Sequence, residues 1–166
     1  MANEINHDFK KILETAKKNV ELFSTIDIDK LLESINKEKN DYLNNKRIQD
    51  LKDEVYESIS ELKITKKQVK IICDKLSEYR LVYRICDLHK GKHVRWIRTY
   101  GLCSDSNLLL TNGGIVVDIK FTDSGINILC RNYMNRFINY NFNDCITFQK
   151  LSTDEQLILM AYEYSL

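Results

Sequence analysis

Two cysteines and two histidines place zinc-binding side chains within one stretch of the chain: Cys86, His89, His93 and Cys103. Zinc prefers thiolate and imidazole ligands, and four of them would close a tetrahedral structural site. The stretch lacks the Cys-x-x-Cys half that a zinc finger usually presents, and a buried thiol that packs as a small hydrophobe is the commoner role of a cysteine. We therefore expect no cofactor and no metal, and these four residues are the one zinc candidate.

A basic band overlaps this stretch. Residues 80–100 carry six arginines and lysines against one aspartate, which leaves a local charge of +5 in a chain whose net charge is +1. Nucleic-acid binders combine cations that contact phosphates with flat rings on which unpaired bases stack. The residues that would form such a site are Arg84, Lys90, Lys92, Arg95, Trp96 and Arg98. The alternative is that Trp96 and Tyr83 belong to the core and that the cations are solvated or paired with acids.

Catalytic motifs are missing from the sequence. There is no Gly-x-Ser-x-Gly elbow, and Gly113-Gly114 lacks the Lys and Ser/Thr that a phosphate loop requires. Cys103 and His93 could meet as nucleophile and base, but nothing in the sequence selects that pair. We predict a protein that is not an enzyme, and a cysteine- or metal-dependent enzyme is the third alternative after nucleic-acid binding.

The elements that must position these residues begin with a helical region over residues 1–79. Residues 3–23 have the apolar spacing of an amphipathic helix, and a second helix is expected to start near Asp27 or Asp29. Thr65 and Gln68 form a capping box that opens a later helix. Before this capping box, apolar residues recur three or four positions apart, as in a coiled-coil seam: Ile48, Leu51, Val55, Ile59 and Leu62. This seam predicts either self-association or a helix packed on its own chain.

Short strands with tight turns follow over residues 80–166, around the pivot Thr111-Asn112-Gly113-Gly114. Strands are expected at 81–86, 93–100, 115–121, 126–130, 137–142 and 145–148, and a second capping box, Ser152 to Glu155, opens a C-terminal helix. Five or six such strands with a closing helix indicate a small antiparallel β-barrel of the SH3 or Tudor kind. The predicted fold class is therefore α+β, with a helical N-terminal region and a small barrel.

The composition of the chain bears on its cellular compartment and on whether it contacts a membrane. The first residues are polar, and no apolar run approaches the length of a membrane span. Five cysteines are scattered without the spacing of a disulfide framework. We expect reduced thiols, a cytoplasmic location and no membrane partner.

Three stretches of the barrel region carry a resemblance: Leu88–Ile97, Leu110–Val117 and Ile146–Glu155. They are similar to uncharacterised small proteins of nucleocytoplasmic large DNA viruses, such as mimivirus-like and algal viruses. In those, a Leu-x-x-Gly-x-x-Ile-Arg-Tyr stretch precedes a Gly-Gly strand and an Ile-Phe-x-Lys ending. The resemblance covers about residues 86–156, and it implies a virion-associated or infection-stage protein without a known activity.

Together these observations predict a non-catalytic structural or interaction protein, viral and virion- or assembly-associated. It would act through contacts of its helices and barrel with a protein partner or a second copy. The alternative partner is DNA or RNA, bound by the basic band, in the host cytoplasm or the virion.

Overall fold

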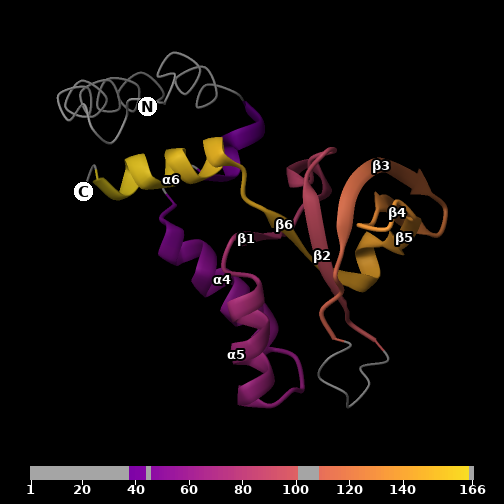
Figure 1. Cartoon of the computed structure of the whole chain (residues 1–166), viewed down its shortest axis with the longest axis horizontal. Coiled ribbons are helices and arrows are strands. Elements are labelled where there is room, and N and C mark those ends of the chain that lie inside the picture. Colours follow the sequence, from indigo (N-terminus) through magenta and orange to yellow (C-terminus); the bar gives the residue numbers. More distant parts are fainter. Residues whose placement is uncertain (1–37, 44–45, 101–108, 165–166) are drawn as a thin grey trace. The chain divides into compact units, whose positions relative to one another are not determined.

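The computed structural model describes residues 38–43, 46–100 and 109–164 (Figure 1). The chain divides into two compact units: residues 1–50 with 152–166, and residues 51–151. This division differs from the predicted boundary at residue 79, because residues 51–79 group with the sheet and residues 152–166 do not. The helix predicted over residues 3–23 and the helix start near Asp27 lie outside the described residues.

The first unit holds the 3-10 helix η1 (Glu38–Leu43) and the helix α6 (Thr153–Tyr164). The predicted capping box at α6 is confirmed: the Glu155 backbone N donates to Ser152 Oγ at 3.2 Å, and the Ser152 backbone N donates to the Glu155 carboxylate. The Tyr42 hydroxyl of η1 donates to the same carboxylate. Glu155 therefore joins the start of α6 to η1.

Two helices of the second unit follow the predicted patterns. Helix α4 spans Ile48–Ser60 and α5 spans Lys66–Lys75, and the Thr65–Gln68 capping box at the start of α5 is confirmed. Within the seam, Leu51, Val55 and Ile59 are buried in the chain itself. Val55 and Ile59 pack in one core cluster with Leu62 at its margin, together with residues of α5 and of the sheet. No helix in the described ranges is long and apolar enough to cross a membrane.

In the described ranges, six antiparallel strands form one sheet, which confirms the α+β class. They are β1 (Tyr79–Val82), β2 (His93–Arg98), β3 (Gly114–Thr122), β4 (Gly125–Arg131), β5 (Phe137–Asn141) and β6 (Cys145–Lys150), in the order β1-β6-β2-β3-β4-β5. The described strands do not close into a barrel, since β1 and β5 end the order without pairing. The strand predicted at 81–86 is wrong beyond Val82, because the 3-10 helix η2 (Ile85–Asp87) follows and leaves β1 only four residues long.

The sheet nevertheless curls strongly. Trp96 of β2 stacks on Tyr140 of β5 with ring centroids 4.1 Å apart and planes 13° apart. Three strand spacings separate β2 from β5, which in a flat sheet is about 14 Å. The curl buries a second core cluster: Val82, Leu88, Val94, Trp96, Val116, Ile128, Cys130 and Tyr140. Figure 1 shows β3 arching beside β4 and β5. Strand β2 is thus buried on both faces, since Ile97 belongs to the helix-side cluster.

A bulge in β3 changes the alternation that the sequence indicates. Val116 pairs with Cys130 and Asp118 pairs with Leu129, so Val117 is the extra residue. Val116 faces the curled core, whereas Ile115 and Val117 are both exposed. In the sequence, Ile115, Val117, Ile119 and Phe121 recur at every second position, which predicts a half-buried strand with these residues on its buried face. That face was the wrong prediction, since Ile115, Val117 and Phe121 are exposed.

Candidate functional site

Most cations of the predicted basic band are already bonded inside the chain. Arg84 forms a two-pronged ion pair with Asp87, at 3.0 and 3.1 Å. Lys90 Nζ lies 2.6 Å from Asp118 Oδ1, which lowers the pKa of that carboxyl. Arg80 is buried and donates to the Asp87 carbonyl at 2.6 Å. These three cations support local structure, and carboxylates offset the charges of Arg84 and Lys90.

The rest of the band does not form a continuous face either. Arg95 donates to the Thr111 carbonyl at 2.8 Å, which ties β2 to the segment before β3. Trp96 is only 4 % exposed, so its ring packs in the core, as the alternative interpretation predicts. The same interpretation is wrong for Tyr83, which is exposed. Lys92 and Arg98 have no ion pair among the described residues, and nucleic-acid binding by the band stays a prediction.

The zinc candidate is only partly described, because Cys103 lies outside the described residues. Cys86 is exposed, and its thiol lies 3.6 Å from Asp87 Oδ1. The His93 Nδ1 lies 3.2 Å from the Tyr79 hydroxyl, and burial followed by the charges of nearby cations lowers the pKa of that imidazole. In the part of the chain that the structure describes, no three His, Cys, Asp or Glu side chains gather as metal ligands.

The thiols of the curled core are poorly suited to nucleophilic chemistry. Burial raises the pKa of Cys130 to about 12 and, opposed in part by Arg98, that of Cys145 to about 11. A thiol attacks as its thiolate, so both side chains are almost fully protonated and unreactive near neutral pH.

An exposed cluster on the turn between β4 and β5 was missed in the sequence. We call it the turn patch, and its members are Arg131, Tyr133, Met134, Arg136 and Phe137. Tyr133 is 77 % exposed, Phe137 65 % and Met134 55 %. The signal in the sequence is that large apolar residues occupy a hairpin turn, where small polar residues are usual.

Side-chain and backbone bonds hold this turn in one shape. Asn132 Oδ1 accepts from the backbone N of Met134 and of Arg136, both at 2.9 Å. The Asn132 backbone N donates to the Arg136 carbonyl at 2.9 Å, and Asn135 takes a left-handed φ of 58°. Asparagine tolerates that conformation better than most residues, so the turn is set before any partner binds.

Strand register extends the turn patch across the sheet. Phe137 pairs with Arg131, Arg131 pairs with Ile115, and Ile115 pairs with His93, so these residues lie on one face. Neither Arg131 nor Arg136 has an ion pair or side-chain hydrogen bond in the described ranges. The result is an apolar and aromatic surface with two uncompensated positive charges.

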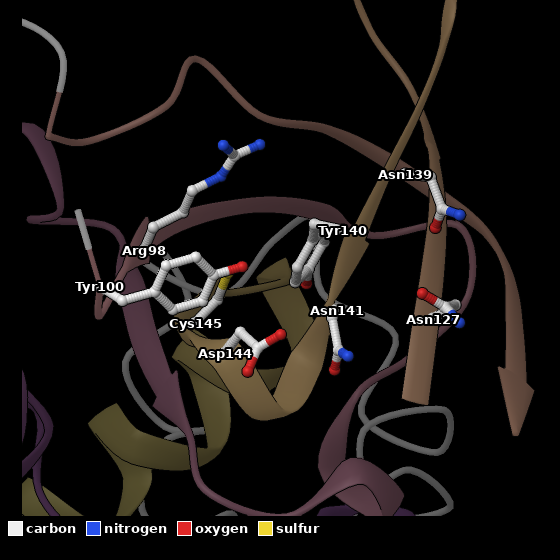
Figure 2. A pocket seen from close by; sticks show the side chains of 8 residues that line it. All are labelled: Arg98, Tyr100, Asn127, Asn139, Tyr140, Asn141, Asp144 and Cys145. Carbon is white, nitrogen blue, oxygen red and sulfur yellow. The ribbon is translucent and has the colours of Figure 1, made fainter. Parts of the chain in front are cut away.

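A polar hollow of about 230 Å³ lies at the open edge of β5. Figure 2 shows Arg98 and Tyr100 on one side of it and the asparagines of β4 and β5 on the other. Its lining is Arg98, Tyr100, Asn127, Asn139, Tyr140, Asn141, Asp144 and Cys145. The side-chain nitrogens of Asn127 and Asn141 already donate to Thr122 and Ser124 at 3.0 Å. The hollow thus holds polar groups but no activated nucleophile.

Comparison with known proteins adds no relative to this geometry. No family model matches the chain, and neither a curated protein nor a solved structure matches it.

Proposed function

We propose that this chain is a non-catalytic interaction module that docks on an acidic protein surface through the turn patch. The observation that carries the proposal is the pairing of three exposed large apolar side chains with two arginines that no described acid neutralises. The sheet serves as the scaffold, and the proposal does not need an SH3- or Tudor-like closed barrel.

Composition favours a protein partner over other classes. Aromatic residues, Met and Arg are the types enriched in the cores of protein interfaces, and Tyr and Arg are frequent hot spots. The turn patch consists only of these types: two arginines, Tyr133, Met134 and Phe137. Contiguous exposed apolar surface on a small protein commonly marks an interaction site.

The rigid turn lowers the cost of binding. Ordering a loop at an interface reduces affinity, and a loop held in its bound shape avoids that cost. The Asn132 side chain already bonds two backbone amides of the turn. The fork of a guanidinium binds carboxylates through two parallel hydrogen bonds, which is why an acidic partner fits Arg131 and Arg136.

Nucleic-acid binding remains the second candidate because of one observation. Arg98 and exposed Tyr100 lie together at the hollow, and Arg98 has no ion pair among the described residues. With Lys92, they would supply cations and a stacking ring. Single-stranded DNA and RNA oligonucleotides test this candidate: binding that persists at physiological salt and is lost on Lys92→Ala with Arg98→Ala would favour it.

The setting also stays a proposal. A viral, virion- or assembly-associated role in the cytoplasm is supported by the resemblance over residues 86–156 alone. No comparison with known proteins tests it.

Selection of random peptides on the immobilised protein tests the proposed function. Enriched peptides should carry carboxylates beside an aromatic or aliphatic residue. Their affinity should fall about tenfold or more in Arg131→Glu with Arg136→Glu, and again in Phe137→Ser, because each change removes a central contact. Phe121→Ser is the matched control, since Phe121 is 71 % exposed at the opposite end of β3 and lies outside the turn patch.

Two results would contradict the proposal. One is enrichment of peptides without acidic residues. The other is an equal loss of affinity in the Phe121 and Phe137 variants, which would place the binding surface elsewhere.

A further inference from the structure

A second mixed surface lies at the other end of the strand order. Glu54, Glu57 and Glu61 are spaced three and four residues apart, so they share one face of α4, and the Glu61 backbone N still bonds the Glu57 carbonyl at 3.2 Å. Tyr83 follows β1 and is 66 % exposed. We call Glu57, Glu61 and Tyr83 the acidic face.

Glu57 and Glu61 are exposed, as Tyr83 is, so a partner can reach all three side chains. Burial, and then the charges of Glu54, Glu57 and Glu61, raise the pKa of the Tyr83 hydroxyl. No described cation bonds the carboxylates of Glu57 and Glu61. Like charges four residues apart on a helix repel each other, and a cationic partner would relieve that repulsion.

We propose that the turn patch of one copy docks on the acidic face of the next copy, so that the chain assembles head to tail. This inference rests on the proposed function and names its partner. Arg131 and Arg136 meet the two carboxylates of Glu57 and Glu61, while Tyr133 and Phe137 pack on Tyr83. The complementary surfaces belong to one chain, so no second protein is required.

Placement of the two surfaces sets the kind of assembly. The turn patch joins β4 to β5, at one end of the strand order, and Tyr83 follows β1, at the other end. A contact between two different surfaces of identical copies is heterologous, and it produces open chains or rings rather than two-fold dimers. Chain-like growth agrees with a structural role.

Sedimentation equilibrium of the full chain, over a range of concentrations at physiological salt, tests the inference with two charge-reversed variants. The first is Arg131→Glu with Arg136→Glu, and the second is Glu57→Arg with Glu61→Arg. Each variant alone should associate about tenfold or more weakly than the wild type, because like charges then face each other. A mixture of the two double variants presents a reversed turn patch to a reversed acidic face, and it therefore regains association.

That mixture also reports the geometry. Each copy of one variant keeps a native turn patch and each copy of the other keeps a native acidic face, so native contacts join one copy of each. The next contact along the chain joins the reversed turn patch of one variant to the reversed acidic face of the other, and these two surfaces again carry opposite charges. The two variants should therefore alternate strictly along a mixed chain. If one variant carries a label, each labelled copy should contact only unlabelled copies.

A control variant separates assembly from general charge effects. Lys66→Glu with Lys67→Glu reverses two exposed charges outside both surfaces and should assemble like the wild type. Urea unfolding shows whether each variant folds. Tyr133→Ser repeats the sedimentation test at the turn patch without a change of charge.

The outcomes separate this inference from the proposed function. Wild-type protein that stays monomeric, or association unchanged in both reversed variants, overturns the inference. If such a monomer still selects acidic peptides through the turn patch, the proposed function stands and only the identity of the partner is wrong. Mixed variants that stay monomeric would also overturn it.

Discussion

Removal of the Tyr140 ring should show how far the curled sheet depends on one contact. Tyr140 is buried, stacks on Trp96 at 4.1 Å and accepts a hydrogen bond from Thr147 Oγ1 at 3.3 Å. Burial raises the pKa of its hydroxyl, so the phenol is neutral across the ordinary pH range. The ring is the link between the edge strand β5 and the central strands β2 and β6.

The expected losses of unfolding free energy differ between two substitutions. Tyr140→Ala removes a buried ring and leaves a cavity, which costs about 3–5 kcal/mol. Tyr140→Phe keeps the ring stack and loses only the hydroxyl, which costs about 1 kcal/mol. Thr147→Val alone leaves the buried phenol without this partner, whereas Thr147→Val with Tyr140→Phe replaces both groups by apolar ones and should cost less than the sum.

Equilibrium unfolding in urea measures these differences, provided that the slope with urea stays constant across the variants. Comparison of the double variant with the two single variants isolates the bond between Tyr140 and Thr147. A loss below about 1 kcal/mol for Tyr140→Ala would refute the reasoning, because a surface ring costs that little and the sheet would then not curl onto β5.

Two further predictions concern backbone and pH. Gly113→Ala should lower the free energy of unfolding by about 3 kcal/mol or more, because the φ of Gly113 is +74° and a Cβ would lie 1.8 Å from the Val94 carbonyl oxygen. Gly91 has a similar φ of +80° but open space around it, so Gly91→Ala should cost only about 1 kcal/mol. Equal losses of unfolding free energy in the two variants, measured in urea, would contradict the close approach of Gly113 to the Val94 carbonyl. Burial raises the pKa of Cys130 to about 12 and that of Cys145 to about 11 from an ordinary 9.0, so the unfolded thiols ionise first and stability should fall as the pH rises above about 9. This loss of stability with rising pH should be smaller in Cys130→Ala with Cys145→Ala. An unchanged slope of stability against pH in that double variant would contradict the prediction.

Local patterns in the sequence predicted local structure well. Both capping boxes formed as expected, because each depends on two residues three positions apart, such as Thr65 and Gln68. The turn at Thr122–Gly125 is local as well: it joins β3 to β4, with the Thr122 hydroxyl donating to the Gly125 carbonyl at 2.8 Å.

Features that depend on distant residues could not be predicted in this way. The sequence of β2 sets Val94 and Trp96 against Arg95 and Ile97 on opposite faces, yet both Trp96 and Ile97 are buried, since one face meets the helices and the other meets the curled sheet. The bulge at Val117 leaves no mark in the apolar pattern. The open sheet is also a long-range feature, because it follows from the strand order, in which β1 and β5 end the sheet without pairing.

The candidate site shows the same limit. A count of charges along residues 80–100 predicted a basic surface, but the acids that neutralise Arg84 and Lys90 are found only in three dimensions: Asp87 turns back in η2, and Asp118 comes from β3. The turn patch has fewer charges and was overlooked, although its two arginines, like Arg98, have no ion pair among the described residues.

Hydroxyl-radical footprinting at low and high protein concentration shows whether the turn patch is the surface that binds. Tyr133 and Phe137 should lose reactivity when the partner surface is present, as a selected acidic peptide or as further copies of the chain. Phe121, which is equally exposed but outside the turn patch, should react unchanged. Unaltered reactivity of Tyr133 and Phe137 under conditions where binding is measured, or equal protection of Phe121, would contradict the turn patch as the interaction surface.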